Sequence, residues 1–133
     1  MDPKNLIRVL IAEDDEGVRE ILASVVRSEP EFALVGAVED ASGAVEAAER
    51  ELPDVALIDV RMPGGGASAT RGIKLRSPAT SVLAFSAHDD ALTMQEMYDV
   101  GADGYVVKGS DVAEIISSIR RAASGCATAQ RAA

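Results

Sequence analysis

The chain has 133 residues, of which 47% are apolar, and this is enough to build one hydrophobic core of ordinary domain size. Its 22 acidic and 13 basic residues give a formal net charge of -9, an excess that argues against direct binding of nucleic acid by this domain. The single cysteine, Cys126, excludes an internal disulfide and a cysteine-based zinc site.

Five short apolar segments with strand character alternate with five segments of helical character. The first, Leu6–Ala12, is an almost continuous apolar run, typical of a strand covered on both faces. Residues 16–28 predict an amphipathic helix, because apolar side chains recur at three- and four-residue spacing: Val18, Ile21, Leu22, Val25 and Val26. The later strands are predicted at Phe32–Val38, Val55–Ile58, Ser81–Phe85 and Tyr105–Val107, and the later helices after Asp40, at Ala69–Leu75, from Asp89 or Asp90 to near Gly101, and from Ser110 or Asp111 to near Gly125.

This alternation predicts a doubly wound α/β fold, in which right-handed crossovers cover both faces of a parallel sheet. The last helix carries an apolar stripe that is expected to face the core, made of Val112, Ile115, Ile116 and Ile119. The helix before it carries Leu92, Met94 and Met97. The two methionines fit either the core or an adaptable contact surface, and the sequence leaves both open.

The sequence predicts one domain over residues 1–125. Residues 126–133 are expected to form a flexible tail or the start of a linker, because they are small and lack a periodic pattern. No apolar run approaches the roughly 20 residues of a membrane helix, and residues 1–10 lack the pattern of a signal peptide. We therefore expect a cytoplasmic protein without a membrane contact.

Polar side chains stand where four of the predicted strands end. In a doubly wound sheet the carboxyl ends of the strands share one edge, and ligands bind there. The residues at this edge are Glu13, Asp14 and Asp15 after the first strand, Asp59 at the end of the third, Ser86 at the end of the fourth and Lys108 after the fifth.

The chemistry of this edge points to a cation and a phosphoryl group. Carboxylates gathered together repel one another, and Mg²⁺ relieves this best because it prefers oxygen ligands. Acids after a strand also cap helices, but Asp59 precedes a loop rich in proline and glycine, which capping explains poorly. The hydroxyl of Ser86 and the ammonium of Lys108 are groups that offset the charge of a phosphorylated carboxylate.

Four segments carry a resemblance to a known family: AEDDEGVRE, PDVALIDVRMPGG, VLAFSAHDD and GADGYVVKGSD. Together, over residues 6–124, they are similar to the receiver domain of bacterial two-component response regulators. The resemblance implies a flavodoxin-like five-stranded sheet in the order 2-1-3-4-5. It also implies that a sensor histidine kinase phosphorylates the domain with Mg²⁺, and that a conformational switch then controls an output domain or a downstream protein.

The resemblance assigns roles to the acidic residues. Asp59 matches the phosphoacceptor. Glu13 and Asp14 match the acidic pair of the family, with Asp14 as the direct Mg²⁺ ligand and Glu13 acting through water. A slip of one residue in this match would exchange these roles with Asp15. The main-chain carbonyl of Arg61 would complete the metal site.

The remaining roles concern the switch and the lifetime of the phosphoryl group. Ser86 matches the switch hydroxyl, Lys108 its ionic partner, and Tyr105 the aromatic residue that changes rotamer with it. Arg61 and His88 match positions that tune how long the phosphoryl group lasts. An ordinary solvated loop histidine accounts for His88 almost as well.

Alternatives to a signalling receiver remain at this stage. One is a protein-interaction module with the receiver fold that works without phosphorylation. A small Mg²⁺-dependent phosphatase is disfavoured because Arg61 stands where a second acid is needed, and a nucleotide binder is disfavoured by the carboxylates after the first strand. We expect a phosphoacceptor that is not an enzyme beyond slow self-dephosphorylation, and homodimer formation on phosphorylation is a further expectation.

Overall fold

The computed structural model describes residues 5–87 and 91–125. Strands and helices alternate along the chain, as predicted. The strands are β1 (Ile7–Ala12), β2 (Phe32–Val38), β3 (Val55–Asp59), β4 (Ser81–Ser86) and β5 (Gly104–Val107), and the helices are α1 (Glu16–Ser28), α2 (Ala41–Glu51), α3 (Gly66–Arg76), α4 (Ala91–Asp99) and α5 (Val112–Ala123).

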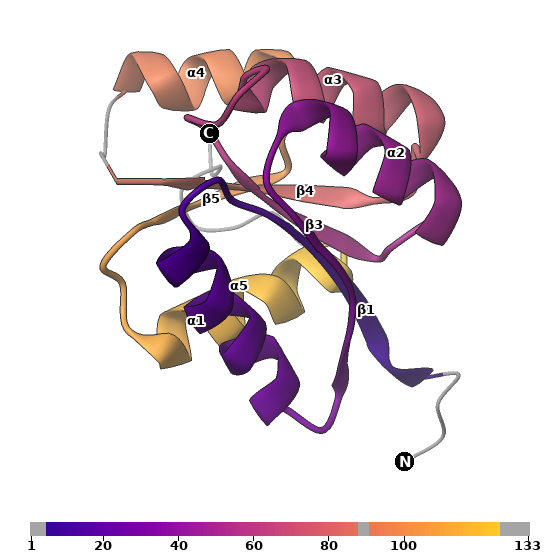
Figure 1. Ribbon diagram of the computed structural model, residues 1–133, viewed down its shortest axis with the longest axis vertical. Helices are drawn as coiled ribbons and strands as arrows, with labels where there is room; N and C mark the ends of the chain where they lie inside the picture. Colours follow the sequence, from indigo (N-terminus) through magenta and orange to yellow (C-terminus); the bar gives the residue numbers. More distant parts are fainter. Residues whose placement is uncertain (1–4, 88–90, 126–133) are drawn as a thin grey trace.

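The strands form one parallel sheet in the order β2-β1-β3-β4-β5, which confirms the predicted doubly wound fold. Helices α1 and α5 cover one face of the sheet, and α2, α3 and α4 cover the other (Figure 1). Each crossover returns the chain to the beginning of the next strand, so the carboxyl ends of all five strands lie at one edge. The predicted polar residues gather at that edge.

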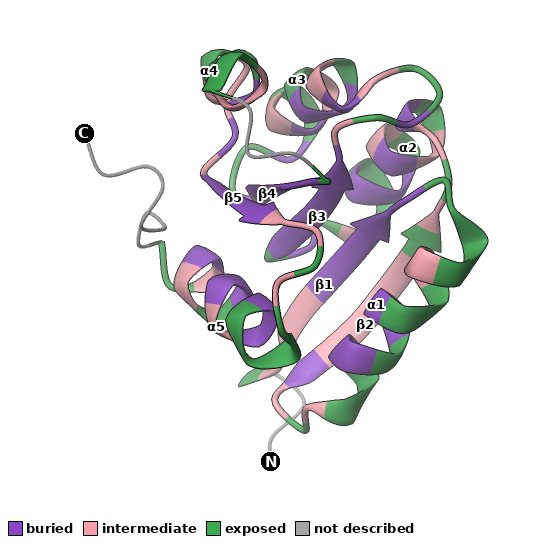
Figure 2. Ribbon diagram, turned by 90° about the vertical axis from the view of Figure 1, so that its left-hand side faces the viewer, coloured by how far each residue is buried: buried purple, intermediate pink, exposed green. Residues whose placement is uncertain are grey.

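The central strands are buried on both faces and form a rigid base for this edge (Figure 2). Every residue of β3, including Asp59 at its end, is buried. One hydrophobic cluster joins the sheet to α1 and α5, and a second joins it to α2, α3 and α4. Because such interiors are close-packed, the main chain at the strand ends has little freedom to move.

Aspartate side chains cap the N-termini of three of the helices. Asp15, Asp40 and Asp111 each accept a hydrogen bond from a main-chain N–H in the first turn, at α1, α2 and α5 respectively. Of the two caps considered for the last helix, the structure therefore selects Asp111. Within the described residues, no helix has the length and apolar character to span a membrane.

Three apolar side chains of the predicted helices are exposed. Val112 is 49% exposed, so its expected place in the core is wrong; it is the first residue of α5, before the helix packs on the sheet. Ile21 of the predicted stripe on α1 and Leu92 of α4 are exposed as well. Met97 is buried and Met94 packs against the same cluster, which places both methionines with the core.

Several boundaries differ from the predicted ones, most of them by one residue and the start of α3 by three. Helix α3 begins at Gly66 and not at Ala69, because Gly65 adopts a left-handed conformation (φ 86°) that turns the chain into the helix earlier. Strand β4 includes Ser86. The predicted helix start at Asp89 or Asp90 lies outside the described residues, as does the predicted tail at residues 126–133.

Candidate functional site

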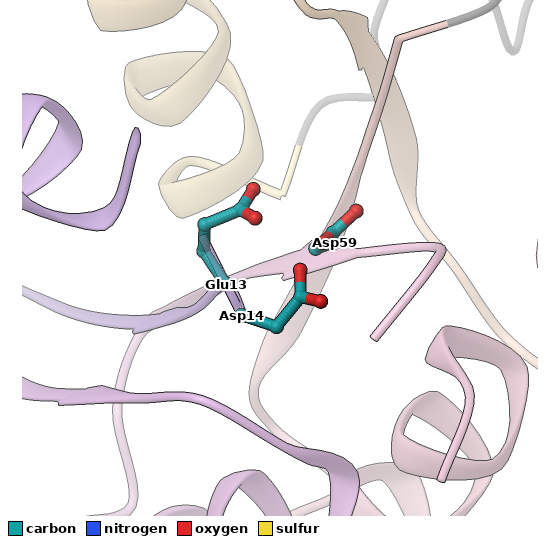
Figure 3. Close-up of side chains that lie close together, drawn as sticks. All are labelled: Glu13, Asp14 and Asp59. Atoms are coloured by element: carbon teal, nitrogen blue, oxygen red, sulfur yellow. The ribbon is translucent and has the colours of Figure 1, made fainter. Parts of the chain in front are cut away.

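Three carboxylates from two strand ends point toward one another at the carboxyl edge of the sheet (Figure 3). Glu13 and Asp14 follow β1 directly, and Asp59 is the last residue of β3, which pairs with β1. Each offers an oxygen within 4.8 Å of the others. Glu13 is 0% and Asp59 2% exposed, whereas Asp14 is exposed to solvent. The cluster therefore opens to solvent on the side of Asp14.

Lys108 is the cation of this cluster. Its Nζ lies 2.9 Å from Oε1 of Glu13 and 3.3 Å from Oδ1 of Asp59. The ring of Phe85, with its centroid 5.5 Å from the same Nζ, adds a weak cation–π attraction. The Lys108 main-chain N–H donates to the carbonyl of Ser86, which ties the end of β5 to the end of β4.

Asp15 lies at a helix cap and not in the carboxylate cluster. Its Oδ1 accepts a hydrogen bond of 2.9 Å from the Val18 N–H, which begins α1. Its own N–H donates to Oε2 of Glu13 at 3.0 Å, and this hydrogen bond helps to fix the position of the Glu13 carboxylate. The three consecutive acids thus have two geometries: Glu13 and Asp14 lie at the sheet edge, and Asp15 caps α1.

The acids and the lysine shift one another's pKa values. Burial raises the pKa of the Glu13 carboxyl group, although contact with Lys108 acts in the opposite direction. Hydrogen bonding with Asp59 lowers the pKa of Asp14. Burial acts to lower the pKa of Lys108, but contact with Glu13 and the negative charge of Asp59 outweigh it and raise that pKa. The lysine therefore remains a cation at neutral pH.

The two oxygens of Asp59 are in different situations. Oδ1 accepts a hydrogen bond of 3.1 Å from the Arg61 N–H, in addition to its contact with Lys108. Oδ2 is buried and has no hydrogen-bond partner within the described residues. A buried oxygen without a partner is costly unless a cation or an incoming group satisfies it. The all-oxygen donor set of Asp59, Glu13 and Asp14 is the kind that suits Mg²⁺.

Gly66, the first residue of α3 after the glycine-rich loop, packs directly on the end of β3. A Cβ atom on Gly66 would lie 2.7 Å from the Asp59 carbonyl oxygen and 2.6 Å from Cα of Val60. No side chain fits there without displacing the main chain that carries the Asp59 carboxylate. The sequence indicated a loop with backbone freedom at this place but did not identify Gly66 as the point of contact.

The other residues assigned from the sequence lie around this cluster. Ser86 is buried at the end of β4, and Tyr105 is fully buried in β5 among the apolar residues below α2, α3 and α4. The Arg61 side chain is exposed next to the site. His88 lies outside the described residues.

Sequence reasoning missed Arg19. The guanidinium Nη1 of this α1 residue donates to the carbonyl oxygen of Glu13 at 2.9 Å and contacts the carbonyl oxygen of Asp14 at 3.4 Å. Nothing in the residue pattern distinguishes Arg19 from other polar residues of the helix, so only the folded loop reveals this contact.

Known proteins share both the fold and the sequence. The chain is 37% identical to the transcriptional regulatory protein DegU of Brevibacillus brevis over 123 residues, which are 92% of this chain and 52% of DegU. The signal receiver domain of the response regulator NarL from Mycobacterium tuberculosis superposes with a TM-score of 0.87 at 32% identity, covering 91% of this chain and 98% of that domain.

A third relative is the receiver domain of the sensor histidine kinase PA1611 from Pseudomonas aeruginosa, solved with a magnesium ion in its active-site cleft. It superposes with a TM-score of 0.80 at 25% identity, covering 90% of this chain and 98% of that domain. The chain spans about half the length of the curated relatives it matches. The sequence model of the response regulator receiver domain family matches residues 9–120 of this chain. The chain therefore belongs to the response regulator receiver domain family, the phosphoacceptor modules of phosphorelay signalling.

Proposed function

We propose that Asp59 is the residue of this receiver domain that accepts a phosphoryl group from a phosphohistidine of a sensor histidine kinase. The observation that carries the proposal is the buried Oδ2 of Asp59, which has no hydrogen-bond partner within the described residues, although Lys108 lies beside the same carboxylate. An oxygen in this state is available for bonding to an incoming group, and the neighbouring ammonium offsets the charge that arrives with it.

The same edge is proposed to hold Mg²⁺. Asp14 and Asp59 would bind the ion directly, Glu13 would act through water, and the main-chain carbonyl of Arg61 would complete the set. The acidic cluster supports this assignment, as does the magnesium ion in the similar receiver domain of PA1611. When bound, Mg²⁺ lowers the repulsion between the carboxylates and a phosphate group.

In the proposed reaction, a carboxylate oxygen of Asp59 attacks the phosphorus atom of the phosphohistidine. The P–N bond breaks, the imidazole nitrogen leaves with the electron pair, and an acyl phosphate remains on Asp59. Lys108 keeps its proton and pairs with the new phosphoryl oxygens. Because the cluster already holds this cation 2.9 Å from Glu13, little rearrangement is needed to offset the added charge.

Phosphorylation is proposed to switch the conformation of the domain. The Ser86 hydroxyl would move to meet the phosphoryl group, and Tyr105 would change rotamer with it. Both residues lie on the strands nearest α4 and α5, so the surface made by these two helices and β5 would change. Arg61 and His88 are proposed to set the lifetime of the phosphoryl group, which the domain itself removes only slowly.

The proposed partners follow from this cycle. A sensor histidine kinase would donate the phosphoryl group, and an output domain or a downstream protein would respond to the switch. Several relatives of about twice this length are named transcriptional regulatory proteins, which supports a regulatory output. The net charge of -9 disfavours a direct contact between this domain and DNA. Phosphorylation is also proposed to favour a homodimer.

Incubation with a small acyl phosphate and Mg²⁺, followed by intact-mass analysis, tests the phosphoacceptor assignment. The unaltered protein should gain one labile phosphoryl group, and Asp59→Asn should gain none. An equal adduct on Asp59→Asn would overturn the assignment. No adduct on the unaltered protein would overturn it too and would favour an interaction module that works without phosphorylation.

A further inference from the structure

We propose that Arg19 is a positioning residue of the metal site. It holds the main chain between β1 and α1 so that the carboxylates of Glu13 and Asp14 face Asp59. The inference rests on the proposed Mg²⁺ site, and it adds a residue from α1 that touches neither metal nor phosphate.

The first step of the argument is the contact itself. Nη1 of Arg19 donates to the Glu13 carbonyl at 2.9 Å and lies 3.4 Å from the Asp14 carbonyl. One guanidinium nitrogen therefore contacts the main chain of both acids. A charged donor makes a stronger hydrogen bond than a neutral one, and the rigid fork of arginine fixes its direction.

The second step is the position of Arg19 in helix α1. Arg19 lies in the first turn of α1, and its main-chain N–H donates to the carbonyl of Asp15, the cap residue, at 2.8 Å. Its side chain is half-buried. The guanidinium thus reaches back from a capped helix to the two residues before the cap and links the helix to the loop.

The third step is what else holds the loop. The Glu13 N–H donates to the carbonyl of Val38 on β2 at 2.9 Å, and the Glu13 carboxylate is held by Asp15 and Lys108. The Asp14 side chain is exposed, so apart from its interaction with Asp59 its direction depends on its main chain. Among the contacts described for this loop, the Arg19 guanidinium contacts the carbonyl groups of Glu13 and Asp14, which lie immediately before and after the Cα atom of Asp14.

Electrostatics and positioning predict opposite effects for the loss of Arg19. Arg19 places a positive charge next to an acidic cluster, so by Coulomb attraction and repulsion alone its removal would strengthen the binding of a cation. If Arg19 instead orients Asp14, its removal weakens the binding of Mg²⁺. Loss of a residue that orients a metal ligand typically costs about 10- to 100-fold in affinity.

Isothermal titration of the full chain with Mg²⁺ separates these effects, with Arg19→Gln, Arg19→Lys and Arg27→Gln as variants. Arg27 is an exposed residue in the last turn of the same helix, so Arg27→Gln removes the same charge without touching the loop. Arg19→Gln should weaken Mg²⁺ binding about tenfold. Arg19→Lys keeps the charge but lacks the fork, and should also weaken binding, whereas Arg27→Gln should bind like the unaltered protein.

Urea denaturation in a chelator accompanies the titration and shows whether each variant is folded. If Arg19→Gln and Arg19→Lys bind Mg²⁺ as tightly as the unaltered protein, or more tightly, the inference about Arg19 is overturned and the proposed metal site is not. If Arg19→Gln does not fold, Arg19→Lys decides the question by the same criterion. If the unaltered protein itself takes up no Mg²⁺, the proposed metal site fails, and this inference fails with it.

Discussion

The ammonium nitrogen of Lys108 lies 2.9 Å from Oε1 of Glu13, a carboxylate that is fully buried. The same nitrogen lies 3.3 Å from the buried Asp59 carboxylate. The receiver site therefore contains its own counter-ion, and the single charge of Lys108 offsets part of the negative charge of the three acids. This relationship determines how the domain responds to loss of the lysine, to pH and to Mg²⁺.

Replacement of Lys108 by methionine should destabilise the metal-free protein. It leaves two buried carboxylates without a cation, and because the lysine side chain is 25% exposed we expect a loss of about 1–3 kcal/mol, below the cost of a fully buried pair. Urea denaturation in a chelator measures the loss, and saturating Mg²⁺ should restore part of it. Arg71→Met, on the exposed surface of α3, is the control. A loss of the same size with and without Mg²⁺ would contradict this account.

Replacement of Glu13 by glutamine should change the pH dependence of stability. Burial raises the pKa of Glu13 in the folded chain, so the folded state binds its proton more readily than the unfolded state. The stability from this group is present at low pH and is lost as pH rises through the folded-state pKa. In a chelator, Glu13→Gln should therefore be more stable than the unaltered protein at pH 7.5.

The stability difference between these two proteins should shrink as the pH falls, because the unaltered Glu13 then gains its own proton. Denaturant titrations at several pH values measure it. Glu20→Gln, which removes an exposed charge from α1, controls for net charge. A difference that widens on acidification has the wrong sign and would refute the role given to burial.

The contrast between Asp14 and Asp15 tests which acids bind the metal. At a Mg²⁺ concentration 100 times the dissociation constant, binding should stabilise the unaltered protein by about 2.7 kcal/mol. Asp14→Asn should lose most of this stabilisation. Asp15→Asn should keep it, since asparagine also caps a helix and Asp15 lies outside the cluster. The opposite result would show that the acidic pair is shifted by one residue.

Ser86 and Tyr105 test the proposed switch. Ser86→Ala should still accept a phosphoryl group, because Asp59 and Lys108 are intact, but the change at Tyr105 should be lost. Near-ultraviolet circular dichroism follows the two tyrosines of the chain, and Tyr98→Phe removes the other one as a control. We expect a phosphorylation-dependent signal in Tyr98→Phe and none in Ser86→Ala. A full signal in Ser86→Ala would separate the hydroxyl from the switch.

Much of the site was predictable because parallel strands bring their carboxyl ends to one edge. Glu13, Asp59 and Lys108 are far apart in the chain, yet each directly follows or ends an apolar run, and the structure brings them within contact distance. The alternation of strands and helices followed from the same hydrophobic pattern, whereas the strand order followed from the resemblance to receiver domains.

The details that depend on hydrogen bonds of a loop were not predictable from the pattern. The resemblance left Asp15 outside the acidic pair, but the hydrogen bond from the Val18 N–H to its side chain is seen only in the fold. The role inferred for Arg19 rests on carbonyl groups, which the sequence does not display. Val112 has the spacing of a core residue but stands where its helix has not reached the sheet, because periodicity gives a direction around a helix and not its distance from the core.

Localisation of the phosphoryl group tests the central claim most directly. After incubation with an acyl phosphate and Mg²⁺, borohydride reduction converts a phosphorylated aspartate to homoserine, which peptide mass spectrometry assigns to one position. The account predicts homoserine at residue 59, dependent on the phosphodonor, and unaltered aspartate at residue 14. Homoserine at residue 14, or none at residue 59 in a protein that has gained a phosphoryl group, would contradict it.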